Sequence, residues 1–167
     1  MSKTTDNLWG AFAGESQANR KYLAFAKKAD ADGFPMVARL FRAAAAAETV
    51  HAHAHLRVLG GVKSTAENLQ AGIDGEGFEF TEMYPQYVAQ AQEEAHKAAL
   101  MSFEYAMAVE KVHHGLYMGA LDAVKAGTDL PEAPVHVCDV CGHTLWGEPP
   151  DKCPVCGAKR DRFFRVD

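Results

Sequence analysis

Two groups of potential metal ligands stand out in the sequence. Near the C-terminus, four cysteines form two C-x-x-C pairs: Cys138, Cys141, Cys153 and Cys156. Earlier in the chain, two Glu-x-x-His steps occur: Glu48 with His51 and Glu110 with His113. Four thiolates suit a soft tetrahedral site, whereas carboxylates and imidazoles suit harder ions such as iron. The sequence therefore predicts two metal centres of different softness in one chain.

The cysteine pairs form two matching knuckles, because Gly142 and Gly157 each follow the second cysteine of a pair. No cysteine is left over, and the N-terminus has no apolar export signal, so metal binding is favoured over disulfides. Zinc and iron both accept four thiolates, so the spacing leaves the metal open. A module this small needs its ion to fold. We expect Trp146, Phe163 and Phe164 to form its small aromatic core.

Composition excludes several functional classes. The chain has 167 residues, 48% of them hydrophobic, which allows one ordinary domain and a small module. Its net charge is -5 and its basic residues are scattered, so we expect no nucleic-acid partner. No apolar stretch is long enough to cross a membrane, and we expect a soluble, cytoplasmic protein.

Four segments with helical periodicity must position the Glu and His residues. They cover about 8–29, 36–59, 64–87 and 103–124. Asp32-Gly33, Gly60-Gly61 and Gly127 mark ends, while a capping box from Ser64 to Glu67 starts the third helix. Pro85 is expected to kink that helix. The turn between the third and fourth helices is unmarked, since 93–97 contains neither Gly nor Pro.

We therefore predict an all-α four-helix bundle followed by a small metal-bound β/loop domain. Two prolines interrupt 128–135, where composition shifts toward Cys, Gly, Pro and aromatic residues. This shift places the expected domains at 1–132 and 133–167.

The acids fall where the helical period expects buried residues. One acid lies on each predicted helix: Glu15, Glu48, Glu76 and Glu110. A fifth, Glu79, follows Glu76 by one helical turn. A buried, unpaired carboxylate costs several kcal/mol, and five would exceed the ~5 to 15 kcal/mol stability of a typical domain. Two divalent ions nearly balance them, and two Glu-x-x-His helices with a Glu on each remaining helix match ferritin-like di-iron bundles.

Other polar residues receive weaker predictions. Four histidines lie off the Glu-x-x-His faces and are expected at the surface or in supporting positions: His53, His55, His96 and His114. Tyr22 and Tyr84 lie on faces near the acids. A buried phenol could donate to a metal-bound carboxylate, or it could simply fill the core, and both readings stay open.

Taken together, these residues resemble the rubrerythrin family. The resemblance covers almost the whole chain, through Glu15 with Arg20 and Tyr22, Glu48-Thr49-Val50-His51, 65–69, Gly75-Glu76 with Glu79, Met83-Tyr84-Pro85, Glu110-Lys111-Val112-His113 and the C-terminal rubredoxin-like knuckles. It implies a non-haem di-iron site in a ferritin-like bundle and an Fe(SCys)4 centre at Cys138, Cys141, Cys153 and Cys156. The implied activity is reduction of hydrogen peroxide to water.

The resemblance also implies roles for individual residues. Glu48 and Glu110 would bridge the irons, Glu15 and Glu76 would be terminal ligands, and His113 would bind one iron. His51 and Glu79 would exchange on the other iron with redox state. Electrons would come from NAD(P)H through a separate reductase or rubredoxin, because the chain has no Gly-rich nucleotide fingerprint.

Two other functions remain open. A ferritin-like ferroxidase or iron-handling protein would share the bundle, but it needs no C-terminal redox module. A non-enzymatic adaptor with a structural zinc ribbon would explain the cysteines, but not the Glu and His set.

The short connection between the second and third helices bears on assembly. A ferritin-like bundle runs these helices parallel, so the chain must return along a helix of about 24 residues, or ~36 Å. Residues 60–64 span at most ~17 Å. We expect either simple up-down-up-down order or a domain-swapped homodimer, in which each di-iron site joins Glu15, Glu48 and His51 of one chain to Glu76, Glu79, Glu110 and His113 of the other.

Overall fold

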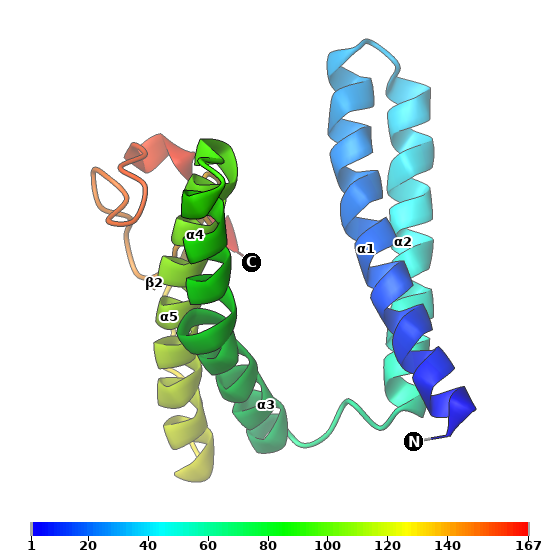
Figure 1. Cartoon of the computed structure of the whole chain (residues 1–167). Helices are drawn as coiled ribbons and strands as arrows, with labels where there is room; N and C mark the ends of the chain where they lie inside the picture. Colours follow the sequence, from blue (N-terminus) through cyan, green and yellow to red (C-terminus); the bar gives the residue numbers. More distant parts are fainter. Residues whose placement is uncertain (1, 167) are drawn as a thin grey trace. The chain divides into compact units, whose positions relative to one another are not determined.

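The computed structural model describes residues 2–166, which divide after Lys63 into two compact units. The first unit is an antiparallel helical hairpin, α1 (Lys3–Ala31) and α2 (Pro35–Val58) (Figure 1). Ser2 caps α1 by accepting a hydrogen bond from Thr5 N. The turn uses Gly33 at a φ of +82°, and Pro35 opens α2, where its missing N–H costs nothing.

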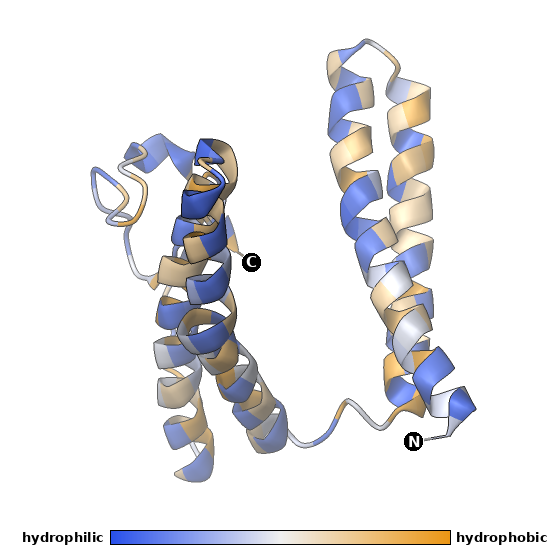
Figure 2. Ribbon diagram, in the orientation of Figure 1, coloured by the Kyte–Doolittle hydropathy of each residue, from blue (hydrophilic) through white to orange (hydrophobic). Residues whose placement is uncertain are grey.

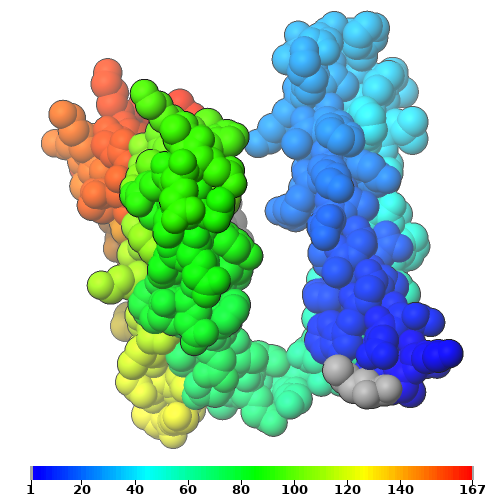
Figure 3. All heavy atoms as spheres, viewed as in Figure 1, coloured from blue at the N-terminus to red at the C-terminus, as the bar shows by residue number. Residues whose placement is uncertain are grey.

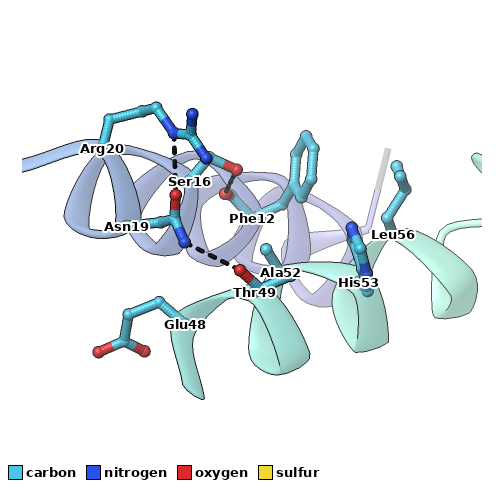
Figure 4. Close-up of a pocket in the computed structure, with 9 residues that line it drawn as sticks. All are labelled: Phe12, Ser16, Asn19, Arg20, Glu48, Thr49, Ala52, His53 and Leu56. Atoms are coloured by element: carbon cyan, nitrogen blue, oxygen red, sulfur yellow. Dashed lines mark hydrogen bonds between the residues drawn. The ribbon is translucent and has the colours of Figure 1, made fainter. Parts of the chain in front are cut away.

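Small side chains let the two helices of this hairpin approach closely. The buried apolar residues of the unit are all alanines: Ala26, Ala29, Ala38, Ala45 and Ala52. Asn19 is the exception, a polar residue only 8% exposed. Its amide donates to Ala45 O at 2.7 Å. Figure 4 shows its two other hydrogen bonds, in which the amide donates to Thr49 Oγ1 at 2.8 Å and the carbonyl accepts from Arg20 Nε. Every polar group of Asn19 thus has a partner, which ties α1 to α2 at one register.

The second unit begins with another helical hairpin. Its first arm is α3 (Thr65–Phe78), the π-helical turn η1 (Glu79–Met83) and α4 (Tyr84–Glu93); its second arm is α5 (Lys97–Lys125). The expected capping box is present, with Ser64 and Glu67 satisfying each other's backbone N–H groups. A π turn, which inserts one extra residue, precedes Pro85 at the position where a kink is expected.

The turn between α4 and α5 explains why the sequence gives no signal there. Ala95 takes the left-handed conformation, with a φ of +52°, that glycine usually supplies. His96 then caps α5, because its Nδ1 accepts a hydrogen bond from Ala99 N at 3.2 Å. Neither residue is a standard marker of a helix end or start.

The C-terminal module is a three-stranded antiparallel sheet with the order β2-β1-β3. Strand β1 (Val135–Cys138) pairs with β2 (Thr144–Trp146) and β3 (Phe163–Val166), and a short 3-10 helix, η2 (Arg160–Arg162), precedes β3. The expected aromatic core is wrong for two residues, since Trp146 and Phe164 are exposed. Cys138, Cys153 and His143 are buried instead, so the sulfur ligands occupy the centre of the module.

The expected fold class is confirmed: four long helices precede a small three-stranded module. Within the second unit, the module contacts the helices through β2 and α5, and Figure 3 shows its orange and red atoms against the green helices. Among residues 2–166, no helix combines the length and apolar character that a membrane span requires.

Several large apolar side chains are left exposed in each helical hairpin. On α2, Leu40 is 69% exposed and Val50 is 64% exposed. Phe78 and Met101 are more than half exposed in the second unit. Figure 2 shows apolar residues spread along the helices of both units. Helix pairs without a core of large side chains need a second layer to be stable.

The Ala95 conformation leads to a prediction about stability. Replacing Ala95 with glycine removes the left-handed strain, about 1 to 2 kcal/mol, and adds a smaller entropic cost in the unfolded chain. We expect Ala95→Gly to raise the free energy of unfolding by about 0.5 to 1 kcal/mol, measured by urea unfolding of the helical circular dichroism signal. Ala126→Gly is the matched control, because Ala126 caps the end of α5 with an unstrained φ of -78°. Glycine relieves no strain there, so we expect this variant to be less stable than the wild type. Equal losses in both variants would contradict this account.

Candidate metal centres

The four cysteines converge as a tetrahedral site requires. Their sulfur atoms lie within 4.8 Å of one another, with 3.7 Å between Cys138 Sγ and Cys156 Sγ and 3.6 Å between Cys141 Sγ and Cys153 Sγ. A tetrahedron with metal–sulfur bonds of about 2.3 Å has edges of about 3.8 Å. A disulfide would need about 2 Å, and all four thiols are free. The arrangement therefore fits one tetrathiolate metal ion.

The two knuckles have the same backbone geometry. Gly142 N donates to Cys138 O at 2.8 Å, and Gly157 N donates to Cys153 O at 2.9 Å. Both glycines have positive φ, +85° and +74°, which an L-residue adopts only with strain. Burial raises the pKa of the Cys141 thiol, so a bound cation is what would keep this sulfur ionised.

The first helical ligand set lies in the α1–α2 hairpin. Glu15, Glu48 and His51 each place a ligand atom within 4.8 Å of the others. His51 Nδ1 lies 2.8 Å from Glu48 Oε2. The Glu48 side chain is 18% exposed, whereas that of His51 is 54% exposed. The structure thus brings these three predicted ligands together. Their side chains are partly exposed within this unit, whereas the sequence predicted buried positions.

The second helical ligand set repeats the first in the other hairpin. Glu76, Glu110 and His113 converge in the same way, and His113 Nδ1 lies 2.8 Å from Glu110 Oε2 and 3.8 Å from Glu76 Oε1. Burial, followed by the hydrogen bond and charge of Glu110 and then the charge of Glu79, raises the pKa of Glu76 from 4.5 to about 7. Crowded acids therefore favour a neutral form here, and a bound cation would reverse that preference.

Glu79 lies beside this second set. Its pKa is raised, chiefly by burial and then by the charge of Glu110, while His113 acts in the opposite direction. Glu79 begins the π turn, in which Tyr84 N bonds to Glu79 O. The π turn inserts a residue at this point, and such turns are frequent at functional sites.

An aromatic cluster accompanies each ligand set. Tyr22, Phe25 and Phe41 pack with ring centroids 5.6 to 6.3 Å apart. Tyr84, Tyr87 and Phe103 pack at 5.5 to 6.3 Å. The two hairpins thus repeat one arrangement of aromatic and acidic residues.

The spacing within this repeat locates the extra residue. Tyr22 follows Glu15 by seven positions, whereas Tyr84 follows Glu76 by eight. The π turn, which lies between Glu79 and Tyr84, accounts for the difference. Glu79 follows Glu76 by three positions, and the residue at the same offset from Glu15 is Ala18. The additional acid therefore belongs to the second hairpin only.

The two tyrosines differ in their relation to the acids. The pKa of Tyr84 is raised by burial and then by the charges of Glu79 and Glu110. Tyr22 packs against Phe25 and Phe41. Of the two readings that the sequence left open, donation to a carboxylate is thus favoured for Tyr84 and aromatic packing for Tyr22.

Two residues near the second ligand set were missed by sequence reasoning. Thr144 Oγ1 of β2 lies 2.9 Å from His113 Nε2. His143 is buried, with its ring against Phe163, and burial followed by the charge of His113 lowers its pKa. Both residues lie about 30 positions from His113, so no local pattern could have revealed the contact.

The four histidines that the sequence placed off the Glu-x-x-His faces occupy varied positions. His96 caps α5 and His114 packs edge-on against Phe80. His53 lines a cavity of about 320 Å³ between α1 and α2, on the face that Figure 4 shows. None of them belongs to the converging ligand groups among the described residues.

Known proteins share this combination of sites. A family model described as rubrerythrin matches residues 6–121, and one described as the rubredoxin-like domain of rubrerythrin matches residues 136–164. Rubrerythrin-2 of Clostridium acetobutylicum is 36% identical, over 96% of this chain and 95% of that relative. Nigerythrin of Nitratidesulfovibrio vulgaris is 35% identical, over 98% of this chain and 86% of that relative.

Solved structures agree with these sequence matches. A fully reduced, all-ferrous nigerythrin superposes with a TM-score of 0.59 at 34% identity, covering 99% of this chain and 88% of that chain. Family models covering most of the sequence, and relatives similar along nearly its full length, establish that the chain belongs to the rubrerythrin family and carries a rubredoxin-like domain at its C-terminal end.

Proposed function

We propose that this protein is a non-haem di-iron peroxidase that reduces hydrogen peroxide to water, with electrons relayed through an Fe(SCys)4 centre. The observation that carries the proposal is the presence of two Glu-Glu-His sets and a tetrathiolate site in one chain. Membership of the rubrerythrin family supports iron at these sites, as does the similarity to a structure described as all ferrous.

The family resemblance assigns each helical ligand a role. Glu15, Glu48, Glu76, Glu110 and His113 would hold the two irons. His51 and Glu79 would be the exchangeable ligands of the set. The high exposure of His51 and the position of Glu79 in a π turn are consistent with ligands that can move.

Peroxide reduction needs two electrons and two protons for each molecule of peroxide. When bound, the two irons would supply both electrons together, and the tetrathiolate iron would return electrons one at a time. The clustered carboxylates favour the higher charge that their metal ions would carry after oxidation.

The chain itself offers groups that can hold the protons. The Tyr84 hydroxyl is protonated at neutral pH, as a phenol normally is, and burial raises its pKa further, so Oη can donate a hydrogen bond to a substrate oxygen. We infer that Tyr84 orients substrate beside Glu79, and that Tyr22 has the equivalent position in the first hairpin. The surrounding aromatic rings would limit the access of water.

The electron donor must be a separate protein under this proposal. Reducing equivalents from NAD(P)H would reach the tetrathiolate centre through a reductase or a rubredoxin. Cys141 and Cys156 are partly exposed, which suits transfer from a donor docked at the module.

We further propose that a homodimer forms by domain swapping, as the short connection after α2 suggests. Gly60 and Gly61 fold back onto α2, with Gly60 N bonded to Arg57 O and Gly61 N to Leu56 O. Gly60 takes a left-handed φ of +67°, which favours glycine at this turn. Only 62–64 remain to connect the units, a reach of about 10 Å.

That reach is far below the ~36 Å length of α2, so the connection cannot return along the helix. A partner's hairpin would supply the second layer that the exposed apolar residues of each unit require. Each complete site would then take Glu15, Glu48 and His51 from one chain and the remaining ligands from its partner.

The metal content of the protein tests the ligand assignment. We expect three irons per chain after anaerobic loading, because seven carboxylate and imidazole residues serve two ions and four thiolates serve one. Mössbauer spectra should show two carboxylate-type irons for each tetrathiolate iron. A reproducible single iron in the helical region would contradict the di-iron assignment.

Two variants separate the roles of the two centres. Glu110→Ala should lower peroxide turnover by at least ~100-fold and leave the visible spectrum of the tetrathiolate iron intact. Cys156→Ser should block re-reduction but allow one turnover of pre-reduced di-iron protein. If Cys156→Ser cycled normally with a physiological donor, the relay role would be wrong.

Complementation tests the swapped dimer. We expect Glu15→Ala and His113→Ala to be inactive separately and to regain peroxidase activity when refolded together. A swapped heterodimer places both defects in one site and leaves the other site intact. Mixing either variant with itself is the control, and absence of recovery in a demonstrated heterodimer would exclude the swap.

A further inference from the structure

A hydrogen-bonded chain joins the C-terminal module to a helical metal ligand within the second unit. Strand β2 lies against α5, the helix that carries Glu110 and His113 (Figure 1). His113 Nε2 lies 2.9 Å from Thr144 Oγ1, and Thr144 Oγ1 donates to Gly142 O at 3.0 Å. Gly142 directly follows the tetrathiolate ligand Cys141.

The single hydroxyl proton of Thr144 sets the direction of the two hydrogen bonds that its oxygen makes. A threonine hydroxyl has a single proton, and Thr144 gives it to Gly142 O. Its oxygen can therefore only accept from His113, so Nε2 must carry a hydrogen. Nδ1 faces Glu110 and Glu76, at 2.8 and 3.8 Å from their carboxylate oxygens. Without a metal ion, a proton must lie between Nδ1 and Glu110 Oε2, and a metal ion bound to Nδ1 would take its place.

Packing against α5 and strand pairing hold the C-terminal module in the position that the contact between Thr144 and His113 requires. A Cβ on Gly142 would lie 3.7 Å from Val109 Cγ1, which is ordinary packing distance, and Val109 is almost fully buried on α5. Thr144 also pairs with Val137 in the sheet, which fixes its backbone. The hydroxyl thus reaches His113 from a rigid strand rather than from a free loop.

His51 provides a comparison inside the same protein. Among the described residues, its ring has a hydrogen-bond partner at Nδ1, Glu48, and no threonine at its other nitrogen. Its side chain is 54% exposed, against 26% for His113. The two Glu-x-x-His steps are alike in sequence but differ in how firmly their imidazoles are held.

We propose that Thr144 is a positioning residue that fixes His113 as an Nδ1 metal ligand and thereby makes the C-terminal module part of the support of the helical metal site. This inference rests on the proposed function only for the identity of the ligands. Groups that orient a ligating histidine typically contribute 10- to 100-fold to metal affinity.

Cobalt binding tests the role without any turnover. The full chain is prepared with zinc in the tetrathiolate site and the helical site emptied by chelation, and Co²⁺ is titrated by its visible absorption. Thr144→Val, which keeps the side-chain shape, should weaken Co²⁺ binding by 10- to 100-fold. Thr144→Ser, which restores the hydroxyl, should return affinity to within about 3-fold of the wild type.

Nitrogen-15 NMR of the histidine rings reads the tautomer directly in the same zinc-loaded protein before cobalt is added. Wild type and Thr144→Ser should show a slowly exchanging Nε2–H on His113, and Thr144→Val should lose this protection. The His51 ring is the internal control and should be unchanged in all three proteins. An unaltered visible spectrum of iron-loaded Thr144→Val would confirm that the module is folded.

Wild-type Co²⁺ affinity and ring exchange in Thr144→Val would overturn the proposal, and so would failure of Thr144→Ser to restore both. Neither readout involves peroxide. A protein that binds cobalt as expected but does not reduce peroxide would therefore count against the proposed function alone.

Discussion

The burial of carboxylates beside one another is the constraint on which the second ligand set depends. Burial, followed by the hydrogen bond and charge of Glu110, raises the pKa of Glu76 to about 7, and burial and then the charge of Glu110 raise that of Glu79. Such a group is unfavourable in a folded protein unless a cation compensates it. The second hairpin therefore positions its ligands at the expense of its own stability, and a bound metal ion would supply the missing favourable interaction.

The need to hold acids near one another also accounts for where small and large side chains lie. Alanines close the α1–α2 interface, and Asn19 secures its register, so the acids stand near one another on adjacent helices. Large apolar residues such as Leu40 and Phe78 remain uncovered within each unit. A bundle completed by a second copy would cover them and bring two ligand sets together, which is why metal binding and assembly are expected to be linked.

Sequence patterns predicted the features that depend on local spacing. The Glu-x-x-His steps, the capping box at Ser64 and the glycines of the two knuckles all follow from short-range geometry. The left-handed Ala95 escaped prediction because alanine gives no signal for that conformation. The π turn at Glu79 escaped because it shifts the helical period by one residue. The contact of Thr144 with His113 depends on tertiary packing across 31 positions, which no periodicity encodes.

The central claim is that the helical ligands hold two irons that act as a pair. Anaerobic titration of fully reduced protein with hydrogen peroxide, followed by its absorption and by a radical trap, tests this most directly. The account predicts that each peroxide oxidises two ferrous ions and that no hydroxyl radical is trapped, because both electrons come from one site. Oxidation of one ferrous ion per peroxide, with trapped hydroxyl radical, would contradict it.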